Sequence, residues 1–299
     1  MIVGYGGATL TPSLSDDVPL RPWDDGRGLV LLEDLLSRLD QVPAQRPVAM
    51  QIVRMTRDDD MSSFRLAAVV GADAPLAARL MRLANSAYYG LSGRVRTMSF
   101  AVTVLGFTTV RSLALSAAAG VGGKDPVPPG FWRRSACTAV AAGELARPLG
   151  LNAPDAFCLG LLSGIGQALL HHADPTGYAL LADAAHERRA LIEAERHRYG
   201  ASHVAVSAAA LRAWSFPADM ASALQVADQW PVSRPAETGD AAAVCLLVAG
   251  EVADRIISSG TTPQNVRHMT GGRVHPDEVD ALVRRVPDLA ADLVRAVTG

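Results

Sequence analysis

Several histidines and carboxylates are spaced so that they could hold a metal ion. Glu193 and His197 are four residues apart in a charged segment, 183–198, that we predict to be helical, so they would share one helix face, and His203 follows Gly200. Two imidazoles and a carboxylate form a donor set that zinc accepts. The segment carries many other charges, however, which is typical of a solvated face, and we favour that interpretation.

Two further groups of ligand-type side chains are less suited to a metal. His171 and His172 are adjacent, so on a helix they diverge by about 100° and would not share an ion. We expect them to stabilise a helix C-terminus. The three aspartates at 58–60 are not followed by the spacing of a calcium loop. There we expect a capped, solvated turn, with Ser62 and Ser63 at the start of the next helix.

The elements that position these residues are arranged, we expect, around the apolar segment 156–170. At roughly 15 residues it is shorter than the ~20 needed to cross a bilayer, so we predict one buried central helix. Gly160, Ser163, Gly164 and Gly166 carry almost no side chain, and each glycine costs about 1 kcal/mol of helix propensity. Close packing by neighbouring helices is expected to compensate.

The composition indicates an all-α protein. Asp and Glu number 30 and Lys and Arg 28, so no net basic field suggests nucleic-acid binding. Aromatic residues make up only 5% of the chain, which suits closely packed helices better than a large sheet. Cys137, Cys158 and Cys245 lie apart in apolar patterns, and the N-terminus lacks the pattern of a signal peptide. We therefore expect a cytoplasmic protein with buried thiols that binds neither nucleic acid nor membrane.

Helical periodicity recurs along most of the chain. Besides the two segments above, we predict helices over 29–39, 48–55, 76–88, 131–146, 218–229 and 241–257, two helices across 100–122 interrupted at Gly106 and Arg111, and two short ones after 276 separated near Pro287. Segments 41–47 and 258–270 are predicted to be connections. Gly and Pro throughout 120–130 make it the clearest break in the chain.

Motifs in the first half resemble the HDOD domain. Segment 73–90, which contains Leu-Met-Arg-Leu-Ala-Asn-Ser-Ala, and Ala-Val-Thr-Val-Leu-Gly at 101–106 are similar to that family's Asp-Pro-x-Leu, Leu-x-x-Ala-Asn-Ser-Ala and Ala-x-x-x-Leu-Gly signatures. The chain departs at the first signature, where it reads Asp-Ala-Pro-Leu. For Asn85 and Ser86 we favour hydrogen bonds to local backbone over contact with a ligand. Gly106 is expected to have a structural role.

The resemblance continues in the second half. Segment 199–217 is similar to the pattern Gly-x-x-His-x-x-Val-Gly-x-x-Leu-x-x-x-Trp-x-x-Pro, with Ser207 in place of the second Gly. The matches are Gly200, His203, Val206, Leu211, Trp214 and Pro217. We expect a structural role for His203 and Pro217, and Trp214 and Phe216 are expected to be core anchors.

The metal-binding positions of the related HD superfamily of metal-dependent phosphohydrolases are substituted. Gly-Leu-Leu-Ser-Gly-Ile-Gly at 160–166 resembles their Gly-Leu-Leu-His-Asp-Ile-Gly, so Ser163 and Gly164 replace the His-Asp doublet. Phe-Trp-Arg-Arg-Ser from 131 resembles Phe-Trp-x-His-Ser, in which Trp132 is retained and Arg134 replaces a metal-binding His. A guanidinium offers no lone pair to a cation, and we favour an ion pair for it over an anion site.

The remaining ligand positions are incomplete as well. Many relatives have a His-His pair before a proline where this chain reads Ala-Asp-Gln-Trp-Pro at 227–231, and Asp254 is the candidate for the last HD-site aspartate. One carboxylate without partners cannot form a catalytic metal site. The resemblance therefore implies no metal, no cofactor and no catalytic residue.

The resemblance covers about residues 30–256 and implies a multi-helix, all-α HDOD-type bundle. We expect a tail over 1–27, an HDOD domain over 28–257 with an N-terminal helical half (28–120) packed on an HD-like half (131–257), and a helical extension over 258–299. In this family the HD fold is retained for signalling and protein interaction. The resemblance thus implies a non-catalytic bacterial regulatory protein with a protein partner. A divergent metal-dependent phosphohydrolase, a sensor of a nucleotide such as a cyclic di-nucleotide, and a homodimer remain open.

Overall fold

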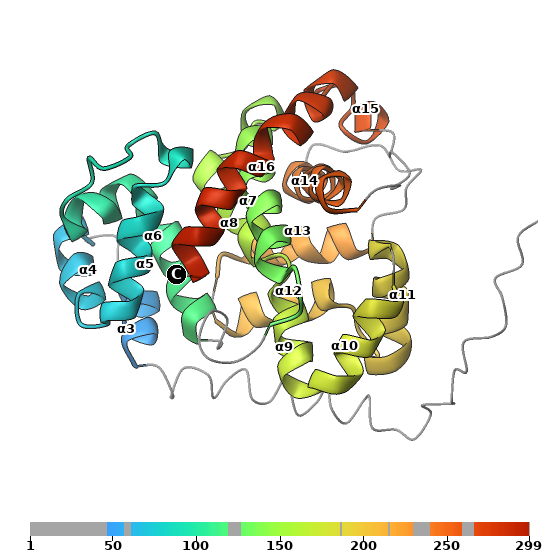
Figure 1. Ribbon diagram of the computed structural model, residues 1–299, viewed down its shortest axis with the longest axis horizontal. Helices are drawn as coiled ribbons and strands as arrows, with labels where there is room; N and C mark the ends of the chain where they lie inside the picture. The colour runs from blue at the N-terminus through green and yellow to red at the C-terminus, as the bar shows by residue number, and fades with distance from the viewer. Residues whose placement is uncertain are drawn as a thin grey trace, which may run out of the picture.

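The computed structural model describes residues 47–56, 61–118, 127–185, 187–214, 216–229, 240–258 and 266–298, and the regular structure in these ranges is helical throughout (Figure 1). The expected all-α fold is confirmed. The predicted tail at 1–27, the helix at 29–39, the aspartates at 58–60 and most of the break at 120–130 lie outside the described residues.

The first part of the fold packs three short helices on a long one. Its elements are α3 (Pro47–Met55), α4 (Ser63–Val70), α5 (Ala74–Ala84), the 3₁₀ turn η1 (Ala87–Tyr89) and α6 (Met98–Ala118). Ser62 caps α4, as expected, because its hydroxyl accepts from the Arg65 N–H at 3.2 Å. The backbone of Gly106 lies at φ 76°, ψ 159°, which kinks α6 and suits glycine. Arg111 does not interrupt the helix; it is buried, with its guanidinium 4.3 Å from the centroid of Phe216.

Asn85 and Ser86 end α5, which stops at Ala84 rather than continuing to Tyr88. The Asn85 amide donates to the carbonyls of Met81 (3.0 Å) and Val95 (2.9 Å) and accepts from the Val95 N–H (3.0 Å). Its expected bonding to backbone is confirmed. For Ser86 the expectation is wrong: its hydroxyl is buried without a hydrogen-bond partner in the described part of the chain, and it does not cap η1.

The second part of the fold contains ten helices in the described ranges. They are α7 (Phe131–Leu149), α8 (Ala153–Leu162), α9 (Ile165–Ala173), α10 (Pro175–Ala184), α11 (Arg188–Tyr199), α12 (His203–Ala213), α13 (Ala218–Asp228), α14 (Ala241–Ile257), α15 (Val266–Met269) and α16 (Pro276–Thr298). The predicted helix 183–198 is therefore the end of α10 followed by α11, and the predicted connection 258–270 contains α15.

The predicted central helix is two helices, α8 and α9, which meet at Ser163 and Gly164. The Ser163 hydroxyl donates to the Gly160 carbonyl at 2.8 Å, and serine and glycine are both weak helix formers, so the chain turns there. The α8–α9 stretch, Ala153–Ala173, is long and apolar enough to cross a membrane, but 78% of its most apolar 18 residues are buried inside the fold. It is thus the core of this structure, as expected.

Glycines let the main chains of neighbouring helices touch. A Cβ at Gly160 would lie 2.7 Å from the Thr138 carbonyl oxygen and 2.8 Å from the Ala139 Cα on α7. A Cβ at Gly166 would lie only 2.0 Å from the His203 carbonyl oxygen on α12. The expected close packing is confirmed: α8 touches α7 at Gly160, and α9 touches α12 at Gly166.

Helix α16 is one helix that runs through Pro287, so the prediction of two short helices is wrong. It crosses the molecule from α15 toward α5 and α6 (Figure 1) and packs on α7, α14, α5 and η1. Its buried face consists of Val279, Leu282, Val286, Ala290 and Leu293. Burying five apolar side chains outweighs the ~3 kcal/mol that an internal proline costs a helix.

Candidate functional site

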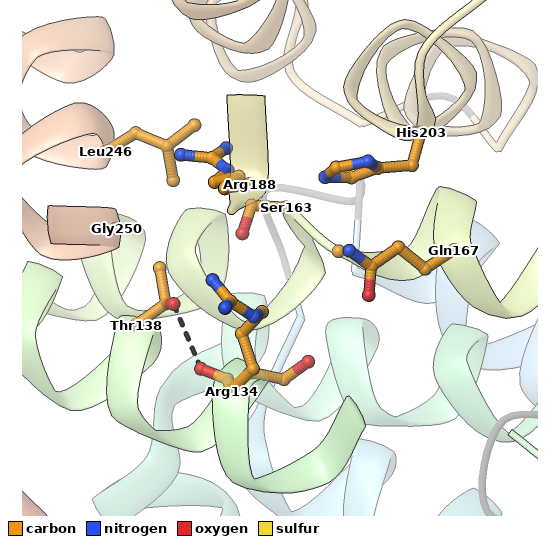
Figure 2. Close-up of a pocket in the computed structure, with 10 residues that line it drawn as sticks. Arg134, Thr138, Ser163, Gln167, Arg188, His203, Leu246 and Gly250 are labelled. Carbon is orange, nitrogen blue, oxygen red and sulfur yellow. Dashed lines mark hydrogen bonds between the residues drawn. The ribbon is translucent and has the colours of Figure 1, made fainter. Parts of the chain in front are cut away.

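A small cavity lies among α7, the α8–α9 junction, α11, α12 and α14 (Figure 2). It is lined by Arg134, Ser135, Thr138, Ser163, Gly164, Gln167, Arg188, His203, Leu246 and Gly250. The structure thus brings together Arg134, Ser163 and Gly164, which the sequence comparison assigned to lost metal positions, and places His203 beside them. The volume that the centres of water molecules can occupy in this cavity is about 20 Å³, which is enough for one or two waters.

Arg134, which lines the cavity, forms an ion pair with a carboxylate behind the cavity wall. Nη1 of Arg134 on α7 bonds Oδ1 of Asp254 on α14, and their side chains are 27% and 13% exposed. The favoured ion pair for Arg134 is therefore present. Asp254, the candidate for the last aspartate of the HD site, is thus paired with Arg134, which stands where the family pattern has a metal-binding histidine.

The donor set does not fit a divalent cation. In the described residues no three side chains among His, Cys, Asp and Glu are grouped so that they could hold a metal. At the cavity the candidate donors are hydroxyls, an amide and His203, with a fixed positive charge on Arg134 and another on Arg188.

The α8–α9 junction is fixed by Ser207, the residue that stands where the family pattern has glycine. The Gly166 N–H donates to the Ser207 hydroxyl at 2.9 Å. The hydroxyl hydrogen can reach the carbonyl oxygen of Ser163 (2.9 Å) or that of His203 (2.8 Å). Ser207 thereby ties α12 to the turn that presents Ser163 to the cavity.

His203 is oriented by a buried carboxylate. Glu195 is fully buried, and its Oε2 lies 2.7 Å from His203 Nδ1 and accepts from the His203 backbone N–H at 2.8 Å. Its Oε1 accepts from the Tyr178 hydroxyl at 2.6 Å. Burial, with the charge of Glu195, raises the pKa of Tyr178 above its ordinary range, so this hydroxyl stays a donor. The imidazole points toward the cavity between Gln167 and Ser163 (Figure 2).

Arg188 reaches the cavity from the first turn of α11. Its guanidinium lies against Gly250 of α14, where a Cβ would be 2.8 Å from Nη1. Burial lowers the pKa of Arg188; the charge of Asp254 opposes this shift, and that of Arg134 adds to it.

The possible zinc ligands Glu193, His197 and His203 do not come together in the structure. Glu193 and His197 are exposed on α11, and Glu193 pairs with Arg189 at 3.3 Å, whereas His203 is buried on Glu195. His171 and His172 do end a helix, α9, as expected. His171 is buried with its ring edge toward Tyr178, and His172 is exposed.

The sequence interpretation missed Arg188 and Glu195, because the charges around them were taken as a solvated face. A signal was present: Arg188, Ile192, Glu195 and Tyr199 follow the i, i+4, i+7, i+11 spacing of one helix face. Two apolar members of that set could have shown that the face is buried.

The other motif residues are structural. Trp214 is 1% exposed and Phe216 6%, so their expected role as core anchors is confirmed. Pro217 precedes the first turn of α13, and Trp132 packs edge-on against Phe131 at 5.2 Å. All three cysteines are free and buried, as expected, and burial raises the pKa of Cys158 to about 11.

Comparison with known proteins identifies the family. The pattern of the HDOD domain matches residues 42–230. An uncharacterized protein of Treponema pallidum (strain Nichols) is 25% identical over 194 residues, which are 62% of this chain and only 37% of that protein. The chain thus spans little more than a third of this curated relative.

Three crystal structures share the fold. One is a Shewanella amazonensis SB2B protein described as a proposed phosphohydrolase; its TM-score is 0.66, its identity 23%, and the match covers 88% of this chain and 97% of that one. The second is a Marinobacter aquaeolei VT8 protein proposed to act in signal transduction, with a TM-score of 0.68, 21% identity, and coverage of 92% of this chain and 66% of that one. The third is a Geobacter sulfurreducens HDOD domain protein of unknown function, with a TM-score of 0.63, 20% identity, and coverage of 90% of this chain and 99% of that one. At these identities the likeness shows the fold. Since the HDOD pattern covers more than half of the 299 residues, this chain belongs to the HDOD domain family.

Proposed function

We propose that this chain is a cytoplasmic regulatory protein that binds a protein partner and has no hydrolytic activity of its own. The observation that carries the non-catalytic part is the ion pair between Arg134, which lines the cavity, and Asp254. The description of the structurally similar Marinobacter protein as a signal-transduction protein agrees with a regulatory role.

The ion pair opposes a metal in two ways. It engages Asp254, and it adds a positive charge that a cation in the cavity would face. Two unit charges 4 Å apart repel by about 4 kcal/mol at an effective dielectric constant of ~20, and a divalent ion doubles this energy. Arg188 adds to the repulsion from the opposite wall. Hydroxyl and amide donors do not offset a cost of that size.

The alternatives have less support. A metal-dependent phosphohydrolase needs a cation and the water that it activates, and the donor set does not fit the cation. A cyclic di-nucleotide is far larger than the room for one or two waters that the cavity offers. Binding of a whole nucleotide there would require the surrounding helices to separate.

Elemental analysis of the purified protein tests the non-catalytic part. We expect less than stoichiometric Fe, Mn, Zn and Mg in the unaltered chain. The informative comparison is the triple variant Arg134→His, Ser163→His, Gly164→Asp, which restores the family's donors. It should gain metal, because a Cβ at Gly164 would meet only ordinary contacts, 3.6 Å from Ser135 Oγ and 3.7 Å from Phe131 Cε2. A stoichiometric divalent ion in the unaltered protein would contradict the proposal.

Cross-linking of the tagged chain in its host cells, followed by mass spectrometry, tests the partner. A specific protein should be enriched over a tag-only control. Recovery of the chain alone, or of its own cross-linked dimer alone, would count against a separate partner.

A further inference from the structure

One of the two arginines that line the cavity, Arg188, has no carboxylate bonded to it among the described residues. The Arg188 side chain forms no hydrogen bond or ion pair within the described residues, although it is half-buried and lies against Gly250. Removing a guanidinium from water is costly unless an anion or acceptor compensates it. Its lowered pKa, caused mainly by burial, expresses the same cost.

The acidic side chains around Arg188 are already engaged. Asp254 is bonded to Arg134. Both oxygens of Glu195 are used, by Tyr178 and by His203. Asp228, the third nearby carboxylate, lies 3.0 Å from Arg196 and accepts from the Ser202 hydroxyl at 2.6 Å. Arg188 is therefore attracted by these charges, but none of the three carboxylates is bonded to it. Its guanidinium N–H groups remain available on the cavity side.

Other hydrogen-bonding groups point into the same space. Figure 2 shows Gln167, His203, Arg134 and Arg188 converging from different helices. Because His203 Nδ1 is turned to Glu195, its second ring nitrogen is the one left for the cavity. Gln167 is 7% exposed and can present its amide N–H groups. The wall is thus rich in donors and positive charge, with Asp254 already paired.

We propose that this cavity binds a small tetrahedral oxyanion, namely inorganic phosphate or the terminal group of a phosphate monoester, with Arg188 as its main ligand. A guanidinium matches two phosphate oxygens in a fork, and Gln167 and His203 supply further donors. The cavity, about 20 Å³ for the centres of water-sized atoms, has room for at most a single phosphoryl group. This ligand goes beyond the regulatory role proposed above and does not depend on the protein partner.

Titration with inorganic phosphate, followed by isothermal calorimetry, tests the site. Arg188→Met should weaken phosphate binding at least about tenfold, the loss expected for one charge-assisted contact. The matched control is Arg189→Met, the adjacent arginine, whose side chain is 77% exposed and pairs with Glu193; it should bind within about twofold of the unaltered chain. Arg188→Lys keeps the charge and loses the fork, so it should fall between the two.

Two further arms make the result decisive. Circular dichroism of Arg188→Met establishes that it is folded. Titration with phosphoserine separates the sources: tighter binding than that of phosphate assigns a monoester, and weaker binding assigns the free ion. Equal affinity of the unaltered protein and Arg188→Met, or no binding of either compound at tens of millimolar, would overturn the proposal. Neither outcome bears on whether the protein binds a divalent metal, so the two proposals fail independently.

Discussion

At the scale of single residues, the Arg134–Asp254 pair contributes to stability only as a pair. Arg134→Met leaves the mostly buried Asp254 without its cation, and we expect it to lower the free energy of unfolding by about 1–3 kcal/mol, less than for a fully buried pair. Adding Asp254→Leu should recover most of this loss, because the uncompensated charge is gone. Urea denaturation of the three proteins measures both steps. A double variant as unstable as the single one would contradict this account.

Asp174 makes stability depend on acid. Burial acts to raise its pKa, but hydrogen bonds from Arg198, the Gly177 N–H and Tyr199 outweigh burial and lower the pKa below its ordinary value. A carboxyl group with a lower pKa in the folded state stabilises the fold above its unfolded pKa of about 4 and loses that contribution as the pH falls through the folded value. Asp174→Asn should therefore flatten the decline of unfolding free energy below about pH 4. Urea curves at several acidic pH values measure it, and an unchanged slope would refute it.

Residue roles were predictable where a local rule applies. Asn85 follows a helix, so its bonding to backbone could be inferred, and large apolar residues such as Trp214 and Phe216 were rightly placed in the core. Arg188 and Glu195 could not be recognised by charge, since Glu195 is buried against His203 of the next helix and Arg188 lies against Gly250 of α14, which is distant in sequence.

At the scale of helices, glycines decide which pairs can touch. Gly166→Ala places a Cβ against the His203 carbonyl, and we expect a loss of at least ~2 kcal/mol in unfolding free energy. Gly164→Ala, two residues away, meets only contacts of 3.6 Å and longer and has a φ of −94°, so it should change stability by less than about 1 kcal/mol. Thermal denaturation compares them. Equal effects would mean that the close approach of α9 and α12 is not a constraint.

Helix positions followed from periodicity, whereas helix ends often did not. The apolar pattern runs through Ser163 and Gly164, so the periodicity alone does not show that these weak helix formers end α8, where Ser207 also fixes the turn. Conversely, Pro287 signals a break that the packing of α16 overrides. The error at Pro287 arises because tertiary contacts of several kcal/mol exceed a local preference of about 3 kcal/mol.

At the scale of the molecule, α16 connects the two parts of the fold, since it packs on α5 and η1 as well as on α7 and α14. Leu282→Ala, at a residue 5% exposed, should lower the unfolding free energy by about 2–5 kcal/mol. Arg284→Ala, on the exposed face of the same helix, should stay within about 0.5 kcal/mol. Both parts should melt together in a single transition. Separate melting of the parts, or equal effects of the two variants, would contradict the connecting role.

The contact of α8 with α7 through Gly160 also limits how this molecule can move. Main chain touches main chain there, with no side chain that could change rotamer, so the two helices have one register and resist sliding. Arg188 meets Gly250 with the tip of a long side chain, which can swing at little cost. The α7–α8 contact therefore holds a fixed geometry, whereas the side chain of Arg188 can adjust its position against α14.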